Sequence, residues 1–426
     1  MSSEKQQSAT LVPVVAGSPA DLEDERLLNA GGLRGAVAMF GRRVRAGDLG
    51  SLPVIIGLVV IWAAFEIISG GIFLQPDNLV NLAAQSAGTG LISVGIVFVL
   101  LLGEIDLSVG SVSGLSASIL GIGLTTLNWP FWSIVLFSLG IGALIGVLYG
   151  FLFTRFGVPS FVVTLAGLLA FEGIQLLVLN TNGSINLQSN SFIVQFSAFA
   201  FLAPWQGYLL AVIAAAAVLA SDLRRASKRR KAGLSTSARS LTFIKAGVIL
   251  VGLAVVEWYL SQDRGTSVSF LFLVLVVIVM NFLVTRTRWG RSIYAVGGNE
   301  EAARRSGINV RLVYVSVFIV TACFAVLGGM LSAGYLTAVT LSAGTGDVNL
   351  NAIAAAVIGG TSLFGGRGNV WSALLGTVVI TSIANGLSLV NFTGDAPRFI
   401  VTGVVLLLAV IVDSLSRRSR ASHGAA

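Results

Sequence analysis

The sequence predicts an all-α, polytopic membrane protein, a bundle of about twelve transmembrane helices. Of its 426 residues, 55% are hydrophobic and only 11% are charged, whereas soluble domains carry about 25% charged residues because their surfaces face water. Several apolar runs approach the roughly 20 residues that a helix needs to cross the hydrocarbon core of a bilayer. The 50 glycines lie within these runs, where small residues let helix backbones approach closely.

The chain divides into three parts. Residues 1–50 are polar, lack an apolar core segment, and are expected to form a disordered cytoplasmic tail rather than a signal peptide. Residues 51–415 form the expected transmembrane domain, and residues 416–426 a basic cytoplasmic tail. The predicted spans lie at 51–70, 79–103, 107–126, 131–154, 160–180, 203–220, 242–260, 267–285, 312–333, 349–365, 369–390 and 398–415. The run 79–103 begins with polar Asn81, Gln85 and Ser86, which is compatible with a broken or re-entrant helix.

Positive charge predicts the orientation of these spans. The loop 221–241 after the sixth span carries seven basic residues, and the loop 286–311 after the eighth span carries six more. The opposite side keeps only Arg264 and the edge residue Arg398. The positive-inside rule therefore places both loops and both termini in the cytoplasm. Because orientation accounts for the net charge of +8, we do not expect nucleic acid as a partner.

Residues with catalytic chemistry are scarce. The single His423 and the single Cys323 exclude a His/Cys metal cluster, an internal disulfide and a Cys–His nucleophilic pair. The sequence also lacks the G-x-x-x-x-G-K-[ST] phosphate loop, so we do not expect this chain to hydrolyse ATP. It predicts neither an enzyme nor a protein with a bound cofactor.

One cytoplasmic loop predicts a sharply bounded short helix. Asn299 suits an N-cap, and a Gly stands where the helix would stop. Acidic residues in the first turn and basic residues in the last form two favourable i,i+4 pairs and complement the helix dipole; the helix comprises Asn299, Glu300, Glu301, Ala302, Ala303, Arg304, Arg305 and the stop Gly307. Such a short helix is marginal alone, so it must pack against something. From local features, a capped surface turn that joins two spans remains an alternative.

Longer motifs carry a family resemblance. Glu301-Ala302-Ala303 followed by Gly307 resembles the EAA loop of binding-protein-dependent ABC importer permeases. The segments Gly103-Glu-Ile-Asp-Leu-Ser-Val-Gly110-Ser, Val158–Gly167, Gly290–Asn299 and Ala354–Gly366 closely resemble motifs of monosaccharide permeases of the ribose, galactose and xylose type. The resemblance covers roughly residues 52 to 415, and the span pair around the loop 221–240 makes the chain most similar to the xylose-type members.

The resemblance implies a division of labour. A permease homodimer in the inner membrane would form the path for a monosaccharide, two ABC ATPase subunits would bind ATP and Mg²⁺, and a periplasmic sugar-binding protein would deliver the sugar. In such permeases the short helix inserts into a groove of the ATPase and carries its motion into the membrane. The glutamate–aspartate motif favours a sugar over branched-chain amino acids, whose permeases share the general architecture.

The motif between the second and third spans allows two interpretations. Glu104 and Asp106 are acids near membrane depth, which favours a role in gating or coupling. Alternatively, Asp106 simply caps the third span. The motif continues through Ser108 and Gly110, and its seven-residue glycine spacing recurs later between Gly359-Gly360 and Gly366, which suggests two similarly oriented repeats.

A few polar residues lie within the spans and are candidates for lining the translocation path. They are Gln85, Ser86, Glu172, Ser382 and Asn385. Hydrogen bonding between helices is the alternative use of such residues. A runner-up function, a self-sufficient ion-coupled transporter, would need acids at the bilayer midplane, and Glu172 is the one plausible candidate.

Overall fold

The computed structural model describes residues 52–179, 183–232, 239–390, and 396–411 without 398, 406 and 409. The predicted cytoplasmic tails, 1–50 and 416–426, lie outside the described residues, as do the middle of the loop 221–241 and the end of the span 398–415. The described part of that last span is helical.

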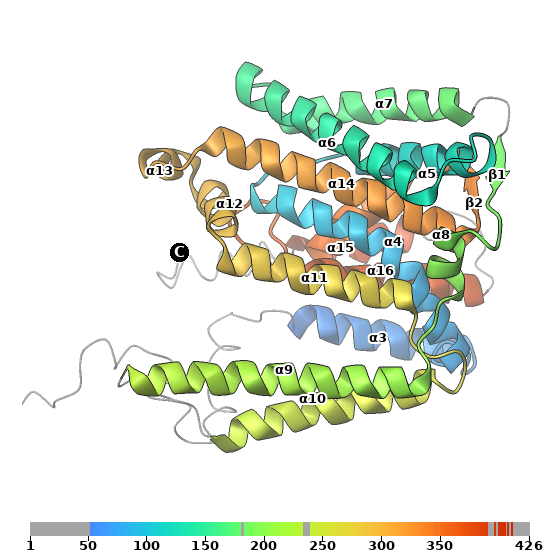
Figure 1. Cartoon of the computed structure of the whole chain (residues 1–426), viewed down its shortest axis with the longest axis vertical. Helices are drawn as coiled ribbons and strands as arrows, with labels where there is room; N and C mark the ends of the chain where they lie inside the picture. The colour runs from blue at the N-terminus through green and yellow to red at the C-terminus, as the bar shows by residue number, and fades with distance from the viewer. Residues whose placement is uncertain are drawn as a thin grey trace, which may run out of the picture. The chain divides into compact units, whose positions relative to one another are not determined.

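The described residues are predominantly helical, which confirms the predicted fold class (Figure 1). Eight of the described helices are long and apolar enough to cross a membrane, and three shorter apolar helices accompany them. The helices and strands are α3 (Leu52–Ile68), α4 (Pro76–Leu101), α5 (Val109–Thr125), α6 (Phe131–Phe156), α7 (Ser160–Leu179), β1 (Ser184–Asn186), α8 (Phe192–Val194), a π-helical turn (Gln195–Phe199), α9 (Pro204–Lys231), α10 (Arg239–Leu260), α11 (Val268–Arg286), α12 (Arg288–Gly298), α13 (Glu300–Arg305), α14 (Val310–Leu336), β2 (Ala338–Thr340), α15 (Val348–Ile358) and α16 (Trp371–Leu389).

The chain forms two compact units. The smaller one contains Leu209–Ala254, which is most of the α9–α10 pair, and the larger one contains Gly47–Tyr208 and Val255–Ala426. Within the smaller unit, Lys245 Nζ forms an ion pair with Asp222 at 3.0 Å, which joins the two helices.

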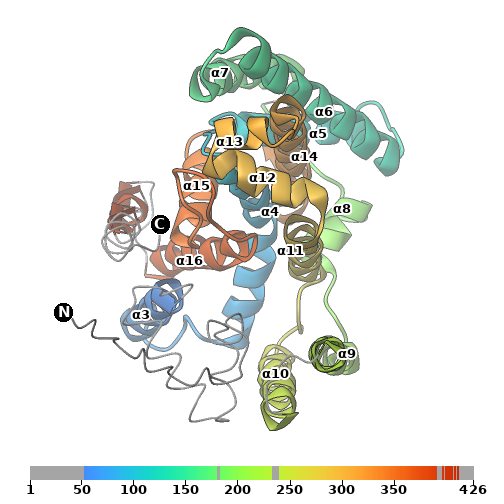
Figure 2. The same ribbon diagram turned by 90° about the vertical axis from the view of Figure 1, so that its left-hand side faces the viewer.

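Helix α4 is the centre of the larger unit. In the most apolar stretch of eighteen residues of α4, 89% of the residues are buried inside the protein; in the corresponding stretch of α7, 28% are buried. Figure 2 shows α4 surrounded by α11, α14, α15 and α16. The contact with α14 is close, because an added Cβ at Gly95 would lie 3.0 Å from the carbonyl oxygen of Thr321. α4 is therefore shielded by other helices, whereas α7 leaves most of its surface available to lipid or to another chain.

Helix α6 packs on α14 through three glycines spaced four apart. Added Cβ atoms at Gly142, Gly146 and Gly150 would lie within 3 Å of atoms of α14, and at Gly146 the nearest is the Cα of Ile319 at 2.4 Å. No side chain larger than hydrogen fits between these backbones, which is the close helix contact that small residues make in membranes. The glycines thus serve helix packing.

The expectation of a break in the span 79–103 is wrong. α4 is one continuous helix of 26 residues, and its polar residues serve other purposes. Asn81 accepts a hydrogen bond from Arg264 at 2.7 Å, and Ser86 bonds back to the carbonyl of Leu82 at 2.7 Å. Because these side chains find partners around an intact helix, the backbone has no need to open.

The non-helical segments lie elsewhere. Residues 102–108 separate α4 from α5. The predicted span 349–365 is helical only as far as Ile358, and residues 359–370 form a glycine-rich loop before α16. In addition, β1 pairs antiparallel with β2, with Ile185 opposite Val339. This small sheet, which the sequence did not predict, lies at the end of the larger unit opposite α13 (Figure 1).

Candidate functional site

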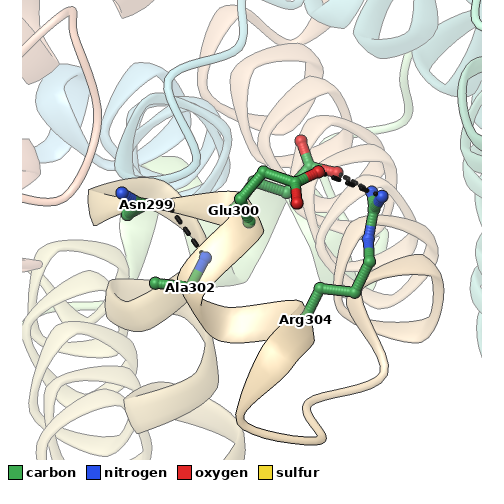
Figure 3. A network of polar contacts seen from close by, with 5 residues as sticks. Asn299, Glu300, Ala302 and Arg304 are labelled. Carbon is green, nitrogen blue, oxygen red and sulfur yellow. Dashed lines mark hydrogen bonds and ion pairs between the residues drawn. The ribbon is translucent and has the colours of Figure 1, made fainter.

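The predicted short helix is α13, which comes between α12 and α14 in the chain and lies at one end of the larger unit (Figure 1). Asn299 caps it, since its Oδ1 accepts a hydrogen bond from the backbone N–H of Ala302 at 2.9 Å (Figure 3). Arg304 forms the predicted ion pair with Glu300. The predicted pair of Glu301 with Arg305 is wrong: Glu301 pairs instead with Arg304 at 3.3 Å, one residue earlier. One guanidinium thus holds both acids of the first turn.

The helix ends where the sequence predicted. Gly307 has φ +84°, a left-handed conformation that favours glycine. Its N–H donates to the carbonyl of Arg304, and the N–H of Ile308 donates to the carbonyl of Ala303, both at 3.1 Å. These two bonds form a Schellman motif, which satisfies carbonyls that the helix end would leave free. Both ends of α13 are therefore fixed by local hydrogen bonds.

The two faces of α13 differ. Ala303 is 3% exposed, so the helix packs into the protein through its small residue. The side chains of Glu300, Glu301 and Arg304 keep 41%, 65% and 58% of their surface exposed. The free face is consequently charged and solvated, and it can pair with a complementary surface on another protein.

Helix α12 connects α13 to the bundle. Trp289 stacks on Phe98 of α4 with ring centroids 5.4 Å apart, and its indole N–H donates to Ser316 Oγ of α14 at 2.8 Å. Tyr294 donates from its hydroxyl to the carbonyl of Gly368 at 2.8 Å. The sequence motif Gly290–Asn299 carried the resemblance, but a helix there was not predicted. The residue that could have predicted α12 is Thr287, because its hydroxyl accepts a hydrogen bond from the N–H of Gly290 and caps the helix.

Three backbones meet at the end of α12, where the two glycine motifs come together. The N–H of Gly366 donates to the carbonyl of Leu101 at 2.8 Å. An added Cβ at Gly297 would lie 1.8 Å from that same carbonyl oxygen, and one at Gly365 would lie 2.9 Å from the N of Gly103. The end of α12, the end of α4 and the 359–370 loop are therefore in direct backbone contact. We call this contact the glycine junction, comprising Leu101, Gly103, Gly297, Gly365 and Gly366.

Gly359 and Gly360, the other glycines of the segment Ala354–Gly366, lie outside the glycine junction. An added Cβ at Gly359 would lie 1.9 Å from the carbonyl oxygen of Ser372, so this residue lets the end of α15 approach the start of α16. Gly360 follows with φ +106° in the turn that leaves α15.

Glu104 follows Gly103 of the glycine junction in the segment that leads to α5. It is half-buried, and burial raises its pKa; a hydrogen bond with Ser160 lowers it, and the charge of Glu300 raises it further. Glu104 and Glu300 are thus close enough for their like charges to repel each other. Sequence reasoning placed both acids in candidate motifs but did not bring them together.

Asp106 does not cap α5 as an N-cap residue, which corrects the simple capping alternative. The N-cap is Ser108, and Asp106 Oδ1 accepts from the N–H and the hydroxyl of Ser108 at 2.8 and 2.7 Å. The Asp106 side chain is 2% exposed. It forms an Asx-type turn that fixes the chain two residues before the helix begins.

The first turn of α5 contacts the first turn of α15. The N–H of Gly110 donates to Asn349 Oδ1, and an added Cβ at Gly344 would lie 2.1 Å from the carbonyl oxygen of Gly110. Gln175 of α7 donates to the carbonyl of Ala343 at 2.9 Å beside them. Asn349 and Gln175 are buried polar residues that sequence reasoning missed, because a lone amide in an apolar run carries no motif.

The predicted path residues are spread over three helices. Gln85 is exposed on α4, Ser86 is fully buried, and Glu172 is half-buried on α7. On α16, Ser382 accepts from Trp62 Nε1 at 2.9 Å, and Asn385 exchanges two hydrogen bonds with Asn78 at 3.0 and 2.9 Å. Ser382 and Asn385 thus join helices within one chain, as the alternative interpretation expected, and their place in a path stays a prediction.

The chain is similar to known transport proteins over most of its length. A family model described as "Branched-chain amino acid transport system / permease component" matches residues 78–411. The chain is 37% identical over 368 residues to the xylose transport system permease protein of Escherichia coli (strain K12), covering 86% of this chain and 92% of the relative. The corresponding Haemophilus influenzae protein is 36% identical over 88% of this chain and 99% of the relative. A D-allose transport system permease protein of Escherichia coli is 30% identical over 84% of this chain and 90% of the relative. No solved structure matches.

Proposed function

Since the chain belongs to the branched-chain amino acid transport system / permease component family, as a multi-pass permease of the inner membrane, we propose that it forms the membrane path of an ATP-driven xylose importer. Its sugar-transporting relatives place it among the permease components of sugar ABC transporters rather than among ion-coupled carriers. Xylose is proposed because the relatives at 36% and 37% identity are xylose permeases, whereas an allose and a ribose permease are 30% and 29% identical.

The observation that carries the coupling mechanism is the construction of α13. Its ends are fixed, its charged face is free, and it is joined through α12 to the glycine junction. A partner ATPase that closes on ATP would displace α13 as a rigid body. The displacement would reach α4 and the 359–370 loop through backbone contacts, which cannot yield by changing a side-chain rotamer.

We include the partners in the proposal. Two copies of the chain would form the path, each with one ATPase subunit that holds ATP and Mg²⁺ at the cytoplasmic end. A periplasmic sugar-binding protein would deliver the monosaccharide at the opposite end, where β1 and β2 lie. Selectivity would then reside in the binding protein, and the five path residues Gln85, Ser86, Glu172, Ser382 and Asn385 would offer the sugar only weak sites, which release a substrate faster than strong ones.

Charge reversal on α13 tests the docking role. Glu301→Arg changes a side chain that is 65% exposed, so the chain should fold normally. We expect proteoliposomes that contain this variant, the ATPase and the binding protein to lose ATP-driven xylose uptake. The control is Asp77→Arg, the same reversal of an exposed acid in the first turn of α4. Normal uptake by Glu301→Arg, or equal loss in both variants, would contradict the docking role.

Uptake by cells tests the substrate and the energy source. Cells that lack this chain and then regain it should recover uptake of labelled xylose, with less recovery for allose and ribose. Uptake should continue when the proton gradient is collapsed and ATP is maintained. Loss of uptake under that condition would favour the ion-coupled alternative.

A further inference from the structure

A groove lies between the basic ends of α9 and α10. It has a volume of about 650 Å³ and lies entirely within the smaller unit. Its walls combine two kinds of side chain. Arg230 and Lys231 come from the last turn of α9 and Arg239 from the first residue of α10, while Leu223 and Phe243 form an apolar wall one to two turns farther from the helix ends.

The charges of this region are unbalanced. Between residues 221 and 245 the sequence has eight basic residues and one acidic residue, Asp222. Asp222 is already paired with Lys245 at 3.0 Å. Within the described part of the chain, no carboxylate forms an ion pair with Arg230, Lys231 or Arg239. These three cations therefore converge on a groove whose walls contain nothing to neutralise them.

The groove has a defined depth in the membrane. The first eighteen residues of α9, Pro204–Ser221, contain no charged side chain, and the charges begin at Asp222. A helix of this pattern places its apolar part in hydrocarbon and its basic end among the headgroups of the cytoplasmic leaflet. The exposed Leu223 and Phe243 continue the apolar surface of the spans into the groove.

We propose that the α9–α10 groove binds one anionic phospholipid of the cytoplasmic leaflet. Its phosphate contacts Arg230, Lys231 and Arg239, and the first part of an acyl chain lies along Leu223 and Phe243. Cationic pockets between transmembrane helices on the cytoplasmic side suit such headgroups. A free phosphate ion would use the cations but not the apolar wall, and an acidic protein surface would reach neither the wall nor hydrocarbon depth.

Lipid retention by the purified full chain tests this proposal. The chain is washed in neutral detergent, mixed with phosphatidylglycerol and phosphatidylcholine, and examined by native mass spectrometry for bound lipid. The groove variant is Arg230→Gln/Lys231→Gln/Arg239→Gln. The matched control removes as many charges from the same basic segment outside the groove, as Arg224→Gln/Arg225→Gln/Lys228→Gln.

We expect the wild-type chain to prefer phosphatidylglycerol and the groove variant to retain it at least about tenfold less, because each Lys or Arg near an anionic headgroup adds attraction. The control should stay within about twofold of the wild type, since Arg224, Arg225 and Lys228 do not line the groove and would not contact a lipid bound in it. Equal loss in both variants would mean general surface attraction and would overturn the proposal.

Two further arms separate the sources of the anion. Phe243→Ser should weaken phosphatidylglycerol retention without increasing the retention of phosphatidylcholine. Millimolar inorganic phosphate should not displace the lipid from the wild-type chain. Displacement by phosphate, or full retention in Phe243→Ser, would refute a lipid site. If the groove variant keeps its lipid, and also no longer co-purifies with the ATPase subunit, the groove is a protein-docking surface instead.

Discussion

Gly297→Ala is the sharpest test of the glycine junction. The new methyl group would lie 1.8 Å from the carbonyl oxygen of Leu101 and 2.9 Å from the N of Gly366. Both neighbours are backbone atoms, so the chain must shift, and overpacking of this kind costs about 1–3 kcal/mol. The shift would also lengthen the 2.8 Å hydrogen bond from Gly366 to Leu101, whose loss costs about 1 kcal/mol.

The chain offers a matched control in the next residue. Gly298 has nothing within 4 Å of an added Cβ, and its φ is not positive, so Gly298→Ala should be tolerated. Both substitutions also lower the flexibility of the same helix end. A difference between them therefore reports contact and not flexibility.

The assay is ATP-driven xylose uptake in proteoliposomes, with ATP hydrolysis measured in parallel. For Gly297→Ala we expect ATPase binding and hydrolysis to persist while uptake falls at least about tenfold, the change that corresponds to about 1.4 kcal/mol of lost coupling. Gly298→Ala should transport like the wild type. Normal transport by Gly297→Ala, or equal loss in both, would refute the idea that this backbone contact carries the movement.

Three other substitutions extend the test. Asn299→Ala removes the cap of a six-residue helix and should cost about 1 kcal/mol locally and reduce uptake, whereas Asn309→Ala uncaps the long α14 and should leave uptake near normal. Burial raises the pKa of Glu104 above 4.5, so its ionisation destabilises the folded chain as the pH rises from 4.5 through the raised pKa. Glu104→Gln should therefore have a higher melting temperature than the wild type at neutral pH. The difference between the two melting temperatures should stop changing below pH 4.5. Asn349→Leu leaves the buried N–H of Gly110 unpaired and should lower the free energy of unfolding by about 1–3 kcal/mol, seen as a lower melting midpoint, with Asn351→Leu as control.

Much of the fold could be predicted from the sequence because the signals are local. A run of about twenty apolar residues is sufficient for a helix in a bilayer, where each backbone group must find a partner within its own segment. The cap at Asn299 and the stop at Gly307 were likewise predictable, because both depend on residues within one turn.

The wrong predictions have a common physical cause: the residues concerned contact partners that are distant in sequence. The polar start of α4 indicated a break, but Asn78 pairs with Asn385, 307 positions away, and Asn81 with Arg264. The run 349–365 looked like a full span by hydropathy, although its second half is a glycine loop packed on the backbones of Leu101 and Gly297. Nor could the sequence show that Glu104 and Glu300 lie near each other.

The contacts of the glycine junction would let one short helix, as proposed for α13, act on two parts of the bundle. The segment 102–108 leads from the junction to α5, and the 359–370 loop leads from it to α16. The start of α5 is in turn bonded to Asn349 at the start of α15, whose other end feeds the same loop. The contacts therefore close a ring through the first turn of α5 and the length of α15. Because packed backbones have discrete arrangements and do not deform continuously, a displacement of α13 should move both segments together or neither.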